Sequence, residues 1–198
     1  MYLAQTGSFT SNELSYVVPD SHFHFTECRK LHLSTTRTDA APGTVLLREM
    51  SEEDLPLFFA QQLDASANWM AAFTAKEPTD RAAFMAHWAK IRADEAILIK
   101  TILFDDQVAG YVTSHGWFGE PEVSYWLGKE YWGKGIATRA LAQFLRQQPV
   151  RPLYARAVKD NIASLRVLEK CGFAIYGEDK GFANARGEEV EELILSLR

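Results

Sequence analysis

From residue 44 onward, hydrophobic and polar positions follow two periods, one typical of strands and one typical of helices. The run TVLLREM (44–50) predicts a strand, and Ser51 with Asp54 three residues later has the spacing of a capping box that opens a helix. The apolar face of that helix is predicted to be Leu55, Phe58, Phe59 and Leu63.

A second helix is predicted from about Thr79, with an apolar stripe at Ala83, Phe84, His87, Trp88 and Ile91. Because His87 lies on this stripe, we interpret it as a packed residue rather than a ligand. The runs at 96–104 and 108–115 flank an Asp-Asp turn and predict a β-hairpin.

The rest of the chain alternates strands with helices and ends in a hairpin. Strands are predicted at 122–128, 153–158, 173–180 and 189–197, and helices at 137–148 and 161–170, before Pro149 and Gly172. The order is strand, helices, hairpin, strand, helix, strand, helix, hairpin. It predicts an α/β (α+β) fold built on one mixed sheet.

The first 43 residues have no sustained period. They are rich in Ser and Thr and end in the linker-like TTRTDAAPGT (35–44). We predict an N-terminal extension, 1–43, followed by one domain, 44–198. His22, His24 and His32 lack a Cys or carboxylate at ligand spacing, so no metal site is predicted.

Composition and charge narrow the classes of partner. A formal net charge of -5 and a pI near 5.6 leave no basic footprint for nucleic acid and weakly favour cationic partners such as amines. No apolar run approaches the roughly 18 residues that span a bilayer, and residues 1–10 do not resemble a secretory signal. Two cysteines, Cys28 and Cys171, are interpreted as reduced thiols, so we expect a cytoplasmic protein without membrane contact.

The segment EYWGKGIATRAL (130–141) places Gly133 and Gly135 where a strand gives way to a helix. A Walker phosphate loop is excluded because its Gly-Lys-Ser/Thr end is missing. A dinucleotide fold is disfavoured because Thr138 occupies the third small position and strand 153–158 ends in Val158 rather than an acidic residue. Either the turn is glycine-rich for packing alone, or its amides and the helix N-terminus hold a pyrophosphate.

The segments EVSYWLGKEYWGKGIATRAL (122–141) and NIASLRVLEKCGF (161–173) resemble the GCN5-related N-acetyltransferases, in the branch of ribosomal-protein N-terminal acetyltransferases. The resemblance covers about residues 44–198. It implies a mostly antiparallel sheet splayed open at its centre, with acetyl-CoA wedged between strands 122–128 and 153–158.

The resemblance also implies how this chain would hold acetyl-CoA. Backbone groups of Trp126 and Leu127 would pair with the pantetheine arm, and Asn161 would bind the arm or the thioester, with Ser164 nearby. The pyrophosphate would be held by the amides of Gly133, Lys134, Gly135, Ile136, Ala137 and Thr138. Lys134 and Arg139 are candidates to meet phosphates of CoA.

Acetyl transfer needs a neutral amine, and Glu122 is the candidate base because it matches a glutamate that recurs in this branch. Alternation along the strand places Glu122, Ser124 and Trp126 on one face. A purely structural role for Glu122 is the alternative. The backbone N–H of Leu127 is the candidate donor to the developing oxyanion.

One departure concerns the proton that the leaving thiolate needs. Many members of the superfamily place a tyrosine where this chain has Leu168. A thiol with a pKa near 8.5 leaves without much help, so water or another side chain could supply the proton.

The acceptor is predicted to be a peptide N-terminus or a small-molecule amine, bound by Trp69, Trp117 and Phe118. The last two residues are placed in a loop before the splayed strand, and core packing is the alternative for all three. A non-catalytic acyl-CoA-binding module and a nucleotide-dependent oxidoreductase are the competing classes. A monomer or a homodimer is expected.

Overall fold

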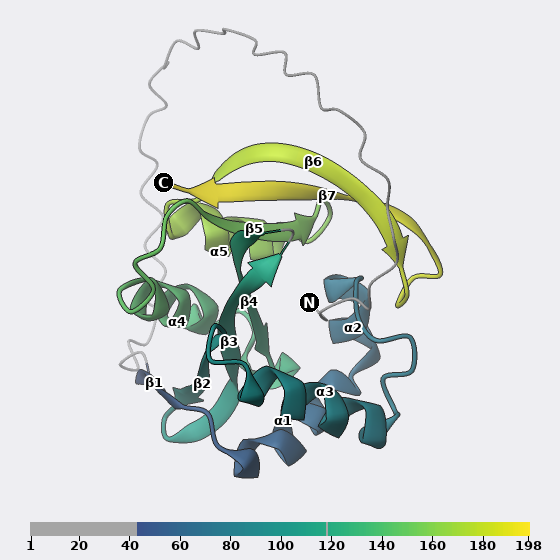
Figure 1. Ribbon diagram of the computed structural model, residues 1–198, viewed down its shortest axis with the longest axis vertical. Helices are drawn as coiled ribbons and strands as arrows, with labels where there is room; N and C mark the ends of the chain where they lie inside the picture. The colour runs from purple at the N-terminus through teal and green to yellow at the C-terminus, as the bar shows by residue number, and fades with distance from the viewer. Residues whose placement is uncertain (1–42, 118) are drawn as a thin grey trace, which may run out of the picture. The chain divides into compact units, whose positions relative to one another are not determined.

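The structure is a computed structural model that describes residues 43–117 and 119–198 (Figure 1). Within these residues seven strands and five α-helices follow the predicted order. The strands are β1 (Val45–Glu49), β2 (Leu98–Phe104), β3 (Gln107–Trp117), β4 (Glu120–Leu127), β5 (Leu153–Val158), β6 (Ala174–Ala183) and β7 (Glu188–Leu197). The helices are α1 (Leu55–Gln62), α2 (Ala65–Ala71), α3 (Arg81–Ala93), α4 (Ile136–Leu145) and α5 (Ile162–Lys170).

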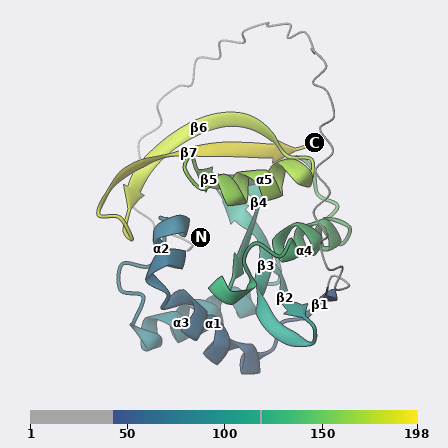
Figure 2. The same ribbon diagram turned by 180° about the vertical axis from the view of Figure 1, so that it is seen from behind.

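All strands join one sheet in the order β1-β2-β3-β4-β5-β7-β6, so the predicted single mixed sheet is confirmed. Every pairing is antiparallel except that of β4 with β5. Those two parallel strands pair only at Glu122 and Tyr154. Beyond this pair they diverge, and the sheet is splayed at its centre (Figures 1 and 2).

Helices cover both faces of the sheet (Figure 2). The main core packs α4 and α5 against β1–β5 and β7, and its fully buried side chains include Phe144, Leu153 and Leu195. A second core on the opposite face packs Phe58 of α1 and Trp88 of α3 against β2 and β3. Apolar residues at helical spacing therefore form the interiors that the sequence pattern predicts.

The predicted capping box is present just before α1. The Asp54 carboxylate accepts the backbone N–H of Ser51 (3.0 Å) and also binds the Arg48 guanidinium and the Thr101 hydroxyl. The first turn, Glu52–Asp54, is a 3-10 helix rather than the start of α1. Leu55 and Phe58 are buried as predicted, but Leu63 lies at the end of α1 and is 44% exposed, so its place on the apolar face was wrong.

Three local features differ from expectation. Helix α2 was not predicted; Asp64 caps it by accepting the N–H of Ala67 (2.8 Å), and seven residues are too few for a clear period. Strand β3 runs to Trp117 and β4 begins at Glu120, so the expected loop is short and Glu122 is the third residue of its strand.

Among the helices described, none is long and apolar enough to cross a membrane.

Candidate active site

The turn before α4 has the backbone of an anion site. Gly133 and Gly135 have φ of +72° and +69°, in the left-handed region that glycine tolerates best. A Cβ at either position would meet no atom of the described chain within 4 Å, so tight packing does not explain the glycines. Gly135 caps α4 without a side-chain hydrogen bond, which leaves the amides at the start of the helix available.

Two cations flank this turn, and they differ in their partners. The Nζ of Lys134 lies 5.8 Å from the ring centroids of both Phe104 and Tyr131. The Arg139 guanidinium donates to the carbonyls of Gly43 (2.5 Å) and Lys134 (3.4 Å). Because the Arg139 guanidinium already binds two backbone carbonyls, Lys134 is the better candidate to bind a phosphate of CoA.

The end of β4 forms one wall of the splay. A Cβ on Gly110 would lie 2.0 Å from the carbonyl oxygen of Trp126, so that carbonyl faces β3. The N–H of Gly128 bonds the carbonyl of Ala109, and antiparallel alternation then turns the backbone of Leu127 away from β3, toward the splay. The backbone of Leu127 therefore faces the opening, whereas the carbonyl of Trp126 faces β3.

The start of α5 faces β4 across the splay. Asn161 caps α5 by accepting the N–H of Ser164 (3.0 Å), and its amide donates to the carbonyl of Met70 (3.0 Å) at α2. Ser164 Oγ lies 2.9 Å from Tyr125 Oη, and burial raises the pKa of Tyr125 to about 12. Leu168, one turn further along, is 2% exposed and belongs to the main core.

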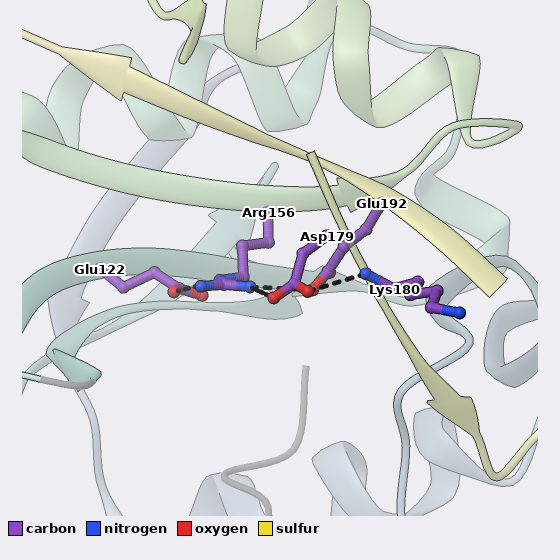
Figure 3. Close-up of polar contacts among 5 residues, drawn as sticks. All are labelled: Glu122, Arg156, Asp179, Lys180 and Glu192. Atoms are coloured by element: carbon purple, nitrogen blue, oxygen red, sulfur yellow. Dashed lines mark hydrogen bonds and ion pairs between the residues drawn. The ribbon is translucent and has the colours of Figure 1, made fainter. Parts of the chain in front are cut away.

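Glu122 lies at the point where β4 and β5 separate (Figure 3). It is 2% exposed; Oε2 lies 3.3 Å from Nε of Arg156 on β5, and Oε1 has no hydrogen-bond partner among the described residues. Burial raises the pKa of Glu122 to about 7; Arg156 opposes this shift and Glu192 adds to it. A carboxyl that titrates near neutrality, with a free oxygen, fits a general base.

Arg156 connects Glu122 to the far side of the splay. Its NH1 group donates to Glu192 of β7 (3.0 Å) and to Asp179 of β6 (2.9 Å), and Asp179 also accepts the backbone N–H of Lys180 (2.8 Å) (Figure 3). Glu192 is 8% exposed, and burial raises its pKa. The sequence analysis missed Arg156 and Glu192, because their approach to Glu122 depends on strand pairings that no local motif fixes.

A histidine that the sequence analysis also missed lies beside Glu122. His115 of β3 is the cross-strand partner of Glu122, and it is 6% exposed with no partner for Nδ1 among the described residues. Burial lowers the pKa of His115 to about 4, so its ring is neutral near pH 7. Pairing strand 108–115 with strand 122–128 through a turn at Gly119 would have revealed this neighbour.

The three aromatic residues predicted to contact the acceptor have different outcomes. Trp69 of α2 is 49% exposed, and the Arg186 guanidinium lies 5.0 Å from its ring centroid. Arg186 is held in turn by Asp160 (2.7 and 2.9 Å). Trp117 ends β3 opposite Glu120, while Phe118 lies outside the described residues.

Comparison with known proteins identifies the class. Residues 44–174 match the family model described as Acetyltransferase (GNAT) domain, and the chain belongs to this family. A solved structure with the same fold is RimJ of Mycobacterium smegmatis in complex with CoA-disulfide, which has a TM-score of 0.67 at 23% identity over 79% of this chain and 82% of that one.

Other relatives differ in the acceptor that their names give. A Bacillus subtilis (strain 168) protein provisionally named phosphinothricin acetyltransferase YwnH is 32% identical over 97 residues, 44% of this chain. The matched region spans 60% of the length of that relative. Spermidine N-acetyltransferase of Vibrio cholerae, solved with CoA and spermine, has a TM-score of 0.63 at 18% identity over 77% of this chain and 95% of that one.

Proposed function

We propose that this protein transfers the acetyl group of acetyl-CoA to a primary amine by direct attack in a ternary complex. The observation that carries the proposal is Glu122, a buried carboxyl with one free oxygen, at the point where the sheet opens. The glycine turn supports it, because positive φ, open space and uncapped helix amides together suit a pyrophosphate.

In the proposed reaction Glu122 accepts a proton from the attacking ammonium, either directly or through water. The amine nitrogen then bonds the acetyl carbon, and the bond from that carbon to sulfur breaks. The Leu127 N–H donates to the carbonyl oxygen as negative charge develops there. Sulfur leaves as the thiolate of CoA and takes up a proton, and Glu122 returns its own proton to solvent.

The proton for the thiolate does not come from position 168, because Leu168 is apolar and lies in the core. The Ser164 hydroxyl, one turn earlier and 2.9 Å from Tyr125 Oη, is the candidate donor. Its supply of a proton is a modest requirement, since a thiol with a pKa near 8.5 is already a good leaving group.

The test combines titration calorimetry with a thiol-release assay. Acetyl-CoA and CoA should bind, NAD should not, and an α-amine should accelerate CoA release from acetyl-CoA. Binding without amine-dependent release would instead support the alternative, a non-catalytic acyl-CoA-binding module. Binding of NAD in place of CoA would support an oxidoreductase.

A further inference from the structure

Three cross-strand pairs of β3 and β4 share one face of the sheet. Their partners in register are Tyr111 and Trp126, Thr113 and Ser124, and His115 and Glu122. Side chains alternate between faces along a strand, so these six lie side by side, with Glu122 at one end. This face is opposite to the one that packs against α4 and α5, where Val123 and Leu127 enter the core.

Two adjoining hollows lie over this face: one between the sheet and the helices α1 and α3, the other between the sheet, the end of α1, α2 and the segment 74–78. One contacts Thr113, His115 and Ser124, and the other contacts Trp126 and Thr74. Both contact Tyr111 and Gln62. We call the two together the acceptor recess; the face that lines it ends at Glu122.

The acceptor recess gathers buried polar atoms that have no hydrogen-bond partner among the described residues. They are Nδ1 of His115, Oγ1 of Thr113, Nε1 of Trp126 and Oγ1 of Thr74. A buried polar atom without a partner is costly, so such atoms in native proteins mark a bound water or a ligand. His115 and Trp126 are 6% and 8% exposed, which makes them built parts of the floor rather than surface groups.

Formal charge is absent from the residues that line the acceptor recess. No Asp, Glu, Lys or Arg is among the lining residues described, and Glu122 is the one carboxyl in the three cross-strand pairs. The neutral ring of His115 offers an acceptor, not a counter-ion. A second ammonium entering the recess would lose its hydration without gaining an opposite charge.

We propose that the acceptor carries a single amine on an uncharged, hydrogen-bonding body that lies in the acceptor recess. This inference rests on the proposed acetyl transfer and names its substrate class. The body would donate to His115 Nδ1, opposite Glu122, or to Thr113 Oγ1, two residues away on β3. Trp126 lies four residues from Glu122 along β4, about 13 Å, so its Nε1 would donate only to an extended acceptor such as a peptide. An α-amino carboxamide has these groups, whether it is a small molecule or the first residue of a peptide, whereas a polyamine does not.

The experiment compares CoA release with four amines at equal free-amine concentration. They are alaninamide, butylamine, putrescine and the peptide Ala-Ser-Ala-amide. We expect kcat/KM for alaninamide to exceed that for butylamine and putrescine by about tenfold or more, the size of one good hydrogen bond. The peptide then distinguishes a peptide acceptor from a small-molecule acceptor. If the natural acceptor is a peptide, the second and third residues should raise kcat/KM above the value for alaninamide.

Two variants test the recess itself. Thr113→Val removes the hydroxyl and keeps the shape, and it should raise KM for alaninamide about tenfold while leaving butylamine unchanged. If Thr113→Val does not fold, Trp126→Phe, which removes the indole N–H, should raise KM for the longer Ala-Ser-Ala-amide. Thr79→Val, at an exposed position before α3, is the matched control and should change neither substrate.

The outcomes distinguish a wrong acceptor class from a wrong proposed function. Putrescine preferred over alaninamide, or equal losses with alaninamide and butylamine in Thr113→Val, overturns the inference while acetyl transfer stands. Failure of every amine to release CoA overturns the proposed function, and the assignment of the acceptor recess falls with it.

Discussion

Nε of Arg156 lies 3.3 Å from Oε2 of Glu122, next to the single residue pair that joins β4 to β5. The guanidinium thus spans the splay at its narrowest point and links the candidate base to Glu192 and Asp179 on the other side. Because Glu122 is buried and Arg156 neutralises its charge only in part, the pKa of Glu122 is raised. This raised pKa can be tested through the reaction rate, the pH dependence of that rate and the thermal stability of the protein.

Glu122→Gln should lower kcat with an α-amine acceptor by about 100-fold at pH 7 and by less at pH 9, because free amine accumulates there without help. Affinity for acetyl-CoA, measured by calorimetry, should stay near that of the wild type. A loss of rate that is the same at both pH values would support a structural role for Glu122.

Arg156→Gln should move the ascending limb of the pH–rate profile to higher pH. The positive charge of Arg156 lowers the pKa of Glu122, which burial raises to about 7, so removing the charge raises this pKa further. When ionised, Glu192 raises the pKa of Glu122 as well, although burial also raises the pKa of Glu192 itself. His115 is neutral and supplies no positive charge to replace that of Arg156.

The control for this profile is Arg146→Gln, which removes the same charge from an exposed position at the end of α4. Its profile should coincide with that of the wild type. If both variants shift equally, net charge rather than the contact with Glu122 sets the profile.

Stability offers an independent test of the raised pKa. Glu122 has an ordinary pKa of 4.5 unfolded and about 7 folded, so the folded state binds more protons between these values. The stability that this proton uptake contributes is full below about pH 4.5 and is lost as pH rises through 7. Glu122→Gln does not titrate, so its melting temperature relative to the wild type should be higher at pH 8 than at pH 5.

The ceiling of this gain is roughly 3 kcal/mol, because the pKa of Glu122 rises from 4.5 to about 7 on folding and each tenfold change in proton affinity is worth about 1.36 kcal/mol. Thermal unfolding of both proteins across pH 5–8 measures it. A difference in melting temperature that stays constant with pH would show that Glu122 titrates at its ordinary value.

The glycine turn gives a prediction about binding. Gly135→Asp should weaken acetyl-CoA binding by several kcal/mol, because it places a carboxylate where a pyrophosphate is expected. Gly187→Asp is the matched control: Gly187 also has positive φ (+70°) and no atom within 4 Å of an added Cβ, but it lies in the β6–β7 turn. Equal affinity in the two folded variants would remove the pyrophosphate assignment.

Sequence patterns predicted those parts of this molecule that are local in the chain. The glycine turn, its helix and the strand that carries Glu122 lie within 26 residues, 120–145, and their periods and spacing are enough to place them. Arg156 of β5 contacts the same carboxyl and Glu192 of β7 contacts Arg156, and these contacts depend on side chains meeting across a splay that no period encodes.

The register of strands explains two further differences. His115 lies beside Glu122 because β3 pairs with β4 with two intervening residues, whereas the sequence favoured a longer loop there. Helix α2 has seven residues and depends on its Asp64 cap and on the bond from Asn161 to Met70, a contact between residues 91 positions apart. Tertiary contacts of this kind stabilise a helix whose local helix propensity alone is too weak to predict it.

The last prediction concerns the proton for the leaving thiolate. Tyr125 Oη and Ser164 Oγ lie 2.9 Å apart across the splay, and burial raises the pKa of Tyr125 to about 12, so the phenol stays protonated and can orient the serine. Ser164→Ala should lower kcat at pH 7 by about tenfold, below the usual range for general acid–base catalysis because the thiolate is already a good leaving group, and Tyr125→Phe by about threefold. Acetyl-CoA affinity should hold in both.

Tyr176→Phe is the control for Tyr125→Phe, because it removes a phenol hydroxyl from a side chain that is 44% exposed on β6. Initial rates at saturating acetyl-CoA, with CoA release followed at pH 7 and pH 9, make the comparison. A serine that donates the proton should matter more at pH 7 than at pH 9, because above its pKa near 8.5 the thiol of CoA stays ionised and needs no proton. Unchanged kcat in Ser164→Ala at both pH values would assign the proton to water instead.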